Sequence, residues 1–155
     1  MGRQEKGAPH CAEPSLSRQT MAETPHLYLV DGSAYIFRAY HRLPPLTDPE
    51  GTPVGAVYGY TTMLWKLADD LHKADGPTHL AVILDKSSQS FRNEIYDQYK
   101  ANRPPPPEDL VHQVPLIRDA TRAFSLPCIE EPDVEADDII ASYAREAQRQ
   151  GWHVT

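Results

Sequence analysis

Short apolar runs that alternate with longer helical patterns constrain the fold of this 155-residue chain more than any other feature. Residues 27–30 and 80–84 are apolar runs, and an aspartate follows each of them, Asp31 and Asp85. Continuous apolar runs of this length are typical of strands that are buried on both faces. Strands that alternate with helices predict right-handed crossovers and a mostly parallel sheet. The expected fold class is therefore α/β, a three-layer sandwich.

The remaining elements continue this alternation. Helices are expected at residues 33–40, 54–71, 91–103, 108–124 and 135–150, and further strands at 127–129 and from 152 onward. The longest of these helices repeats apolar residues at spacings of three and four. The four prolines between residues 43 and 53 predict a loop, and the four consecutive prolines at 104–107 predict an extended connector.

Composition limits the class of protein. An apolar fraction of 40 % and a charged fraction of 24 % fit one globular domain at residues 26–155. Residues 1–25 are polar and aperiodic and predict a disordered tail, in which Met21 is a candidate translation start. No apolar run approaches the roughly 20 residues of a membrane span. Cys11 and Cys128 have no zinc-site spacing and predict no disulfide scaffold, so we expect a cytoplasmic protein without a membrane partner.

Charge is distributed unevenly along the chain. The net charge of −7 argues against a nucleic-acid partner, but residues 86–103 carry four cations against two acids. Residues 130–138 carry six acids and no cation. Charge runs of this kind are typical of solvated faces. A metal-dependent nuclease needs the same separation, with acids for the ion and cations for the phosphate chain.

Three carboxylates, Glu135, Asp137 and Asp138, lie at the expected start of a helix. Glu135 and Asp138 share a helical face, whereas Asp137 lies about 100° from Asp138 around an ideal helix. Acids in a first turn also interact favourably with the helix dipole, which is the structural alternative. Asp31 and Asp85, at the carboxyl ends of strands, should approach the same edge of the sheet. Gathered carboxylates repel one another unless a hard cation such as Mg²⁺ or Mn²⁺ binds them.

The sequence Asp31-Gly-Ser33 leaves a second chemistry open. A strand followed by Asp-x-Asp begins the phosphatases that form an aspartyl phosphate. Ser33 replaces the second acid and argues against that reading. The interpretation favoured for Ser33 is the N-cap of the following helix.

Cations follow an aromatic residue in the sequence Tyr99-Lys100-Ala-Asn-Arg103. Lys100 and Arg103 are three residues apart on one face of the expected helix and could hold a phosphate, while Tyr99 stacks on a terminal base. The alternative is a surface helix with cations near its C-terminus. Arg38 and Arg42, after the first strand, could face the same site.

Three segments together resemble a known family: LVDGSAYIFRAYH, FRNEIYDQYKANRPP and VEADDIIASYAREA. The chain is similar, from about Leu27 to Thr155, to the N-terminal 5′–3′ exonuclease domain of bacterial DNA polymerase I. That domain belongs to the flap-endonuclease-like group and has a PIN-type fold.

The resemblance implies a DNA nuclease with a two-metal site for Mg²⁺ or Mn²⁺. It implies that the metal ligands are Asp31, Asp85, Glu135, Asp137 and Asp138. It implies a helical gateway for the 5′ strand containing Tyr99, Lys100 and Arg103, of which Lys100 and Arg103 are the expected catalytic residues. Arg38 and Arg92 are further expected DNA contacts. The substrate would be DNA with a 5′ flap, a nick or a free 5′ end, with no obligate protein partner.

Two departures from the family weaken these expectations. The chain has Leu84-Asp85-Lys86 where the family often has Phe-Asp-Ala, and Lys86 should weaken the hold on an ion. The family continues the strand near Trp152 into further acids and then into a helix-hairpin-helix region. We therefore expect a truncated domain that is incomplete at its C-terminus, with one nearly complete metal site and weak or absent hydrolysis. A non-catalytic DNA-binding fragment and an aspartyl-phosphate phosphatase are the alternative functions.

Overall fold

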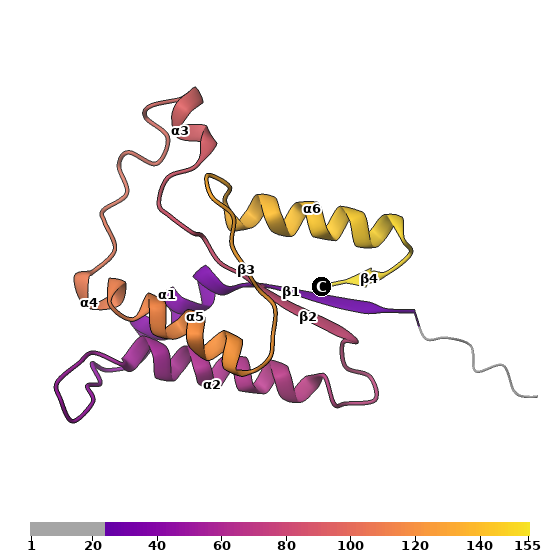
Figure 1. The fold of residues 1–155 in the computed structure, drawn as a ribbon, viewed down its shortest axis with the longest axis horizontal. Helices are drawn as coiled ribbons and strands as arrows, with labels where there is room; N and C mark the ends of the chain where they lie inside the picture. The colour runs from indigo at the N-terminus through magenta and orange to yellow at the C-terminus, as the bar shows by residue number, and fades with distance from the viewer. Residues whose placement is uncertain (1–23) are drawn as a thin grey trace, which may run out of the picture.

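A computed structural model describes residues 24–155, which form one parallel sheet between two layers of helices (Figure 1). The predicted tail up to residue 23, with Met21, lies outside the described residues. The strands are β1 (His26–Asp31), β2 (His79–Ile83), β3 (Cys128–Ile129) and β4 (His153–Val154). Their order is β3-β2-β1-β4 and every neighbouring pair is parallel, which confirms the predicted sheet.

Helices cover both faces of this sheet, as expected for a three-layer α/β sandwich (Figure 1). The helices are α1 (Gly32–Arg42), α2 (Gly55–Asp70), α3 (Phe91–Ile95), α4 (Glu108–Val111), α5 (Val114–Ala123) and α6 (Ala136–Arg149). The helices α1, α2 and α5 lie on one face, while α6 lies on the other and contacts β1, β2 and β4. None of the helices in the described part of the chain has the length and apolar character needed to cross a membrane.

The alternation of side chains along the strands decides which face each acid occupies. Leu80, Val82 and Leu84 belong to the large core beneath α1, α2 and α5, while Ala81 and Ile83 belong to the smaller core beneath α6. Leu29 of β1 also packs in the core beneath α6. Because successive side chains point to opposite faces, Asp31 shares the α6 face with Leu29, as Asp85 does with Ile83.

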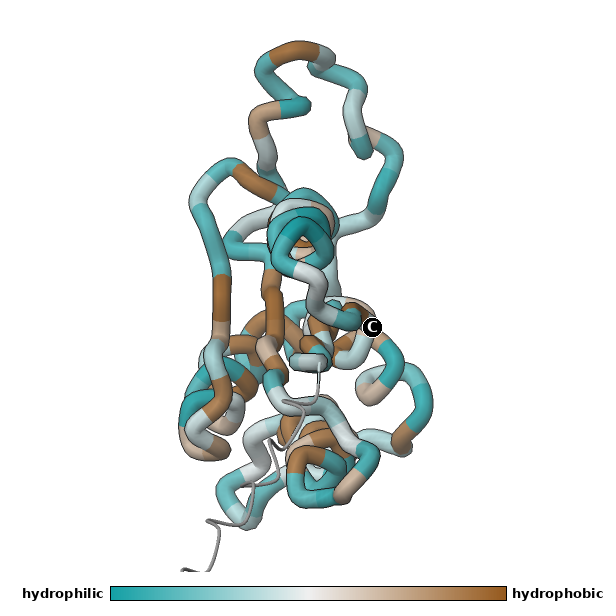
Figure 2. Tube along the Cα trace, turned by 90° about the vertical axis from the view of Figure 1, so that its right-hand side faces the viewer, coloured by the Kyte–Doolittle hydropathy of each residue, from teal (hydrophilic) through white to brown (hydrophobic). Residues whose placement is uncertain are grey.

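The connection from β2 to α4 projects from the body of the protein as an arch, residues 86–107 (Figure 1). The arch is mostly hydrophilic, with an apolar stretch near its tip (Figure 2), and Ile95 at the end of α3 is 77 % exposed. A helix over residues 91–103 was expected, but α3 ends at Ile95 and Tyr96 is extended. Beyond it, the backbone bonds join residues three apart, as in turns.

Asn93 links the start of α3 to the turns that follow the helix. Its side chain accepts a hydrogen bond from the Ser90 amide (3.0 Å), which caps the start of α3, and donates one to the Tyr99 carbonyl (3.1 Å), which holds the chain beyond Ile95 in turns. Tyr99 then lies over the body of the protein instead of continuing a helix. The prediction that Lys100 and Arg103 share one helical face is therefore wrong.

The helix expected at residues 108–124 is interrupted between α4 and α5. Pro115 has no N–H to bond to Val111, so one α-helical hydrogen bond is missing at the junction. Gln113, only 2 % exposed, lies there and accepts hydrogen bonds from the amides of Ala56 (2.8 Å) and Val57 (3.2 Å). A side chain from the junction thus satisfies the N-terminus of α2, which has no side-chain cap of its own.

Candidate metal and nucleic-acid site

Asp31 and Asp85 lie at the carboxyl ends of the two central strands. Asp31 is the N-cap of α1, and its Oδ1 accepts a hydrogen bond from the Ala34 amide (3.0 Å). The prediction of Ser33 as the N-cap is therefore wrong. Ser33 donates from Oγ to Oδ2 of Asp85 (2.8 Å) instead. The other oxygen of Asp85, Oδ1, accepts from the amide of Ala136, the first residue of α6 (2.8 Å).

Glu135 is the N-cap residue of α6 and is surrounded by hydrogen-bond donors. Lys100 Nζ lies 2.8 Å from its Oε1, to which Ser90 Oγ also donates (3.1 Å), and Tyr99 OH lies 3.2 Å from its Oε2. Burial by itself would raise the pKa of Glu135. The hydrogen bonds from Lys100, Ser90 and Tyr99 together outweigh that effect and lower its pKa. Glu135 is therefore held as a carboxylate.

Asp138 forms a bidentate ion pair with Arg92 of α3. The guanidinium nitrogens lie 2.5 Å and 2.7 Å from the two carboxylate oxygens. The hydrogen bonds from Arg92 are the main reason that the pKa of Asp138 is lowered, and the same bonds raise the pKa of Arg92. Arg92 also lies 3.5 Å from Glu135, and its guanidinium carbon is 4.7 Å from the centre of the Phe91 ring.

Lys100 reaches Glu135 from a strained backbone position. Its φ angle is +55°, in the left-handed region that residues with a Cβ seldom adopt. Burial would lower the pKa of Lys100, but its contact with Glu135 outweighs burial and raises the pKa. Lys100 and Arg92 together tie the arch to the start of α6.

The hydrogen bond of the Asp31 side chain is to its own helix, and four further predicted residues do not join this network either. Asp137 is exposed on α6, and no hydrogen bond or ion pair involves its side chain within residues 24–155. Arg103 is exposed on the arch. Arg38 and Arg42 line a cleft of about 240 Å³ between α1 and α2, and none of the five predicted metal ligands lines that cleft. Their predicted roles stay predictions.

The carboxylates have the chemistry of a divalent-metal site, although within residues 24–155 they do not lie close enough together to share one ion. The oxygens of Asp31, Asp85 and Glu135 come from two strand ends and one helix start on a single face, and carboxylate oxygens suit Mg²⁺ or Mn²⁺. In the part of the chain that the structure describes, no three acidic, histidine or cysteine side chains are close enough to share one ion. Lys100 and Arg92 balance the charges of Glu135 and Asp138 instead.

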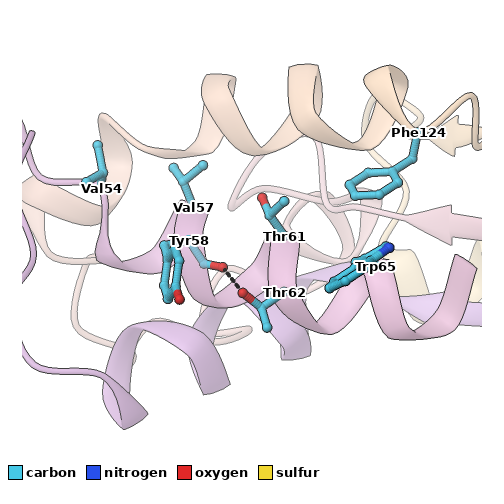
Figure 3. Close-up of a pocket in the computed structure, with 7 residues that line it drawn as sticks. All are labelled: Val54, Val57, Tyr58, Thr61, Thr62, Trp65 and Phe124. Atoms are coloured by element: carbon cyan, nitrogen blue, oxygen red, sulfur yellow. Dashed lines mark hydrogen bonds between the residues drawn. The ribbon is translucent and has the colours of Figure 1, made fainter. Parts of the chain in front are cut away.

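A cleft larger than the one beside Arg38 and Arg42 lies away from these acids, along α2 (Figure 3). It has a volume of about 630 Å³, and its walls are mainly apolar side chains of α2 together with Phe124, which follows α5. Thr62 donates to the Tyr58 carbonyl within the same helix (2.8 Å), so its hydroxyl is satisfied. The volume of a cleft therefore does not identify the charged site in this protein.

Two contacts near the site were not anticipated from the sequence. Ser90 is 5 % exposed and donates to Glu135, although no local pattern marks it. Glu130 directly follows β3 at the same sheet edge, but Arg118 Nε lies 2.7 Å from its Oε2. Cys128 packs in the core beneath α1, α2 and α5, so alternation along the chain places Glu130 on that face, opposite to the face of Asp31 and Asp85.

A parallel three-layer α/β sandwich with carboxylates at one edge and a cationic arch above them is of the PIN-like class. Among solved structures, the chain is similar to the 5′-exonuclease of bacteriophage T5 with bound zinc ions (TM-score 0.59, 22 % identity, 84 % of this chain and 47 % of that one). It is also similar to a T5 flap endonuclease in a complex with DNA and metal ions (TM-score 0.54, 25 % identity, 83 % of this chain and 47 % of that one). The predicted fold class is confirmed.

The sequence comparisons give the family. The family described as "5′-3′ exonuclease, N-terminal resolvase-like domain" matches residues 26–155. The chain is 58 % identical over 139 residues to DNA polymerase I of Rhizobium leguminosarum, covering 87 % of this chain and 14 % of the relative. It is 37 % identical over 128 residues to a 5′-3′ exonuclease of Aquifex aeolicus, covering 83 % of this chain and 43 % of the relative.

This chain belongs to the 5′-3′ exonuclease family, as the three sequence motifs predicted. It spans less than half the length of each of these two relatives.

Proposed function

We propose that the chain supplies part of a metal-dependent 5′–3′ exonuclease or 5′ flap nuclease that cleaves DNA phosphodiester bonds. The observation that carries this proposal is the position of three carboxylates, Asp31, Asp85 and Glu135, on the α6 face of the sheet edge beneath the cationic arch. The family match and the DNA polymerase I relatives support it. The cytoplasmic location expected from the sequence stays a prediction.

A divalent cation, Mg²⁺ or Mn²⁺, would be held by Asp31, Asp85 and Glu135, with Asp137 and Asp138 as further ligands. When bound, it would activate a water molecule and stabilise the leaving oxygen of the phosphodiester. The T5 relatives of known structure bind metal ions, which supports this part of the proposal. The chain's own contribution is to fix the carboxylates on three rigid elements.

The arch supplies the contacts to DNA in this proposal. Lys100 and Arg92 can exchange their carboxylate partners for phosphate oxygens, and Arg103 is exposed on the same segment. Tyr99 offers an aromatic face next to both cations, since its ring centre is 5.1 Å from Lys100 Nζ and 5.8 Å from the guanidinium carbon of Arg92. Cations interleaved with an aromatic ring are typical of single-strand binding. Arg38 would contact DNA from α1, and the substrate would carry a 5′ flap, a nick or a free 5′ end.

Single-turnover cleavage of a labelled 5′ flap, with protein in excess and Mn²⁺ present, tests the proposal. We expect slow release of the 5′ product by the wild-type chain and none by Asp85→Asn. Asp119→Asn, an exposed aspartate of α5 paired with Arg122, is the matched control and should cleave like the wild type. Equal release by the wild type and Asp85→Asn would contradict the proposal.

A DNA-binding role without catalysis is the second candidate. The ion pairs of Lys100 and Arg92 favour it, because they neutralise two acids without a metal. This candidate predicts DNA affinity that falls with salt and survives Asp85→Asn, together with no metal-dependent cleavage. DNA affinity and metal-dependent cleavage can be measured on the same protein samples, so the two measurements distinguish a nuclease from a protein that only binds DNA.

A further inference from the structure

Gly32 brings the first turn of α1 unusually close to the end of β2. A Cβ atom at Gly32 would lie 2.5 Å from Leu84 Cδ2, 2.8 Å from Val82 Cγ1 and 3.0 Å from the Ile83 carbonyl oxygen. Any larger residue would have to displace the Leu84 and Val82 side chains and press on the Ile83 carbonyl. The next residue, Ser33, therefore lies beside Asp85, the residue that follows Leu84.

Ser33 and Asp85 form a closed pair of hydrogen bonds. Ser33 Oγ donates to Asp85 Oδ2 (2.8 Å), and the Asp85 amide donates back to Ser33 Oγ (3.3 Å). The opposite oxygen, Oδ1, accepts from the Ala136 amide (2.8 Å). One carboxylate is therefore held from both sides, by α1 and by the start of α6.

We propose that Ser33 is a positioning residue that orients Asp85 for metal binding; this inference rests on the proposed function. Each carboxylate oxygen can accept about two hydrogen bonds or ligand contacts. Within residues 24–155, one hydrogen bond reaches each oxygen of Asp85, which leaves room for a cation on both. Ser33 fixes the rotation of the carboxylate, so that binding an ion does not first require ordering it.

The serine therefore has a role that neither sequence-based interpretation gave it. It is not the N-cap of α1, because Asp31 occupies that position. Its hydroxyl, at the position where an aspartyl-phosphate phosphatase has its second acid, donates to Asp85 instead. A hydroxyl at this position can donate to one carboxylate oxygen and accept from the same residue's amide, which an acid could not do when ionised.

Mn²⁺ affinity of the purified chain, measured from the signal of free Mn²⁺ by electron paramagnetic resonance, tests the proposal without DNA or turnover. We expect Ser33→Ala to weaken binding about 10-fold, the lower end of the usual effect of removing a hydrogen-bond partner from a metal ligand. Ser33→Thr keeps the hydroxyl and should bind within about two-fold of the wild type. Ser142→Ala is the matched control, since the Ser142 hydroxyl donates to the Asp138 carbonyl of its own helix (2.7 Å) and not to a carboxylate.

Urea unfolding of each variant separates positioning from stability. A merely structural role would lower the free energy of unfolding of Ser33→Ala and leave its Mn²⁺ affinity unchanged, which would overturn the proposal. An equal loss of affinity in Ser33→Thr would overturn it as well, because the hydroxyl would then not be the cause. If Ser33→Ala fails to fold, Ser33→Cys, which keeps the volume and weakens the hydrogen bond, takes its place under the same criterion.

Asp85→Asn distinguishes this inference from the proposed function. If Asp85→Asn loses Mn²⁺ binding while Ser33→Ala retains it, only the role of Ser33 is refuted. If the wild type binds Mn²⁺ no better than Asp85→Asn, the metal site itself is refuted, and the role of Ser33 with it.

Discussion

Lys100 Nζ lies 2.8 Å from Glu135 Oε1, so a cation of the arch neutralises the carboxylate that begins α6. Glu135 is 15 % exposed and is therefore largely shielded from solvent. A lysine in this position competes with any metal ion for the same oxygen. It also joins the arch to the start of α6.

Lys100→Met should therefore tighten Mn²⁺ binding and weaken DNA binding. A unit charge at about 4 Å is worth about 1 kcal/mol even in water, which corresponds to about five-fold in metal affinity. DNA affinity should fall because one phosphate contact is lost. Mn²⁺ titration and fluorescence anisotropy with a labelled 5′ flap measure the two effects.

Lys66→Met is the control for this prediction. Lys66 is an exposed lysine of α2, on the opposite face of the sheet, and its loss should leave Mn²⁺ affinity unchanged. A fall of Mn²⁺ affinity in Lys100→Met would show that Lys100 supports the metal site instead of competing with the ion.

Arg92→Met should destabilise the fold, because Asp138 then loses its bidentate ion pair, in which the guanidinium nitrogens lie 2.5 Å and 2.7 Å from the carboxylate oxygens. We expect a loss in the free energy of unfolding, measured in urea, that exceeds the loss from breaking a fully exposed pair. Arg122→Met removes a single exposed contact to Asp119 (3.4 Å) and should cost less than about 0.5 kcal/mol. Equal losses in the two variants would show that the arch is not held by Arg92.

Stability should fall in acid because the folded protein lowers the pKa values of Glu135 and Asp138. A group whose pKa is depressed by folding stabilises the protein fully above its unfolded pKa, which is about 4 for these acids. That contribution is lost as the pH falls through the lower folded values. The double variant Glu135→Gln/Asp138→Asn should therefore lose less unfolding free energy between about pH 4 and pH 2 than the wild type. If the free energy of unfolding fell equally with pH in the two proteins, Glu135 and Asp138 would not be the cause of the acid sensitivity.

Gly32→Ala should lower the free energy of unfolding by about 1–2 kcal/mol, since its Cβ would meet Leu84 and the Ile83 carbonyl. Gly55→Ala is the matched change at the first residue of α2. There the nearest heavy atom is 3.5 Å from the added carbon, which is an ordinary contact. Thermal unfolding measures the stability of both variants. If Gly32→Ala were as stable as the wild type, α1 would be free to move away from β2.

The strands and the acids at their ends could be predicted from sequence because both are local features. Asp31 and Asp85 each follow an apolar run, and parallel pairing brings such ends to one edge. The arch could not be predicted, because its polar residues fit a helix, and the contacts of Tyr99 and Lys100 with Glu135 that hold it in another shape join residues 36 and 35 positions apart. Pairing of Ser33 with Asp85, 52 residues away, has no local signal either.

A crystal structure of the chain soaked in Mn²⁺, with the anomalous signal of manganese recorded, tests the central claim most directly. We predict a manganese peak at the sheet edge, bound by Asp31 and Asp85 with Glu135 turned toward it and Lys100 displaced. A saturating soak that leaves Lys100 on Glu135 and no manganese between Asp31 and Asp85 would contradict the proposed metal site.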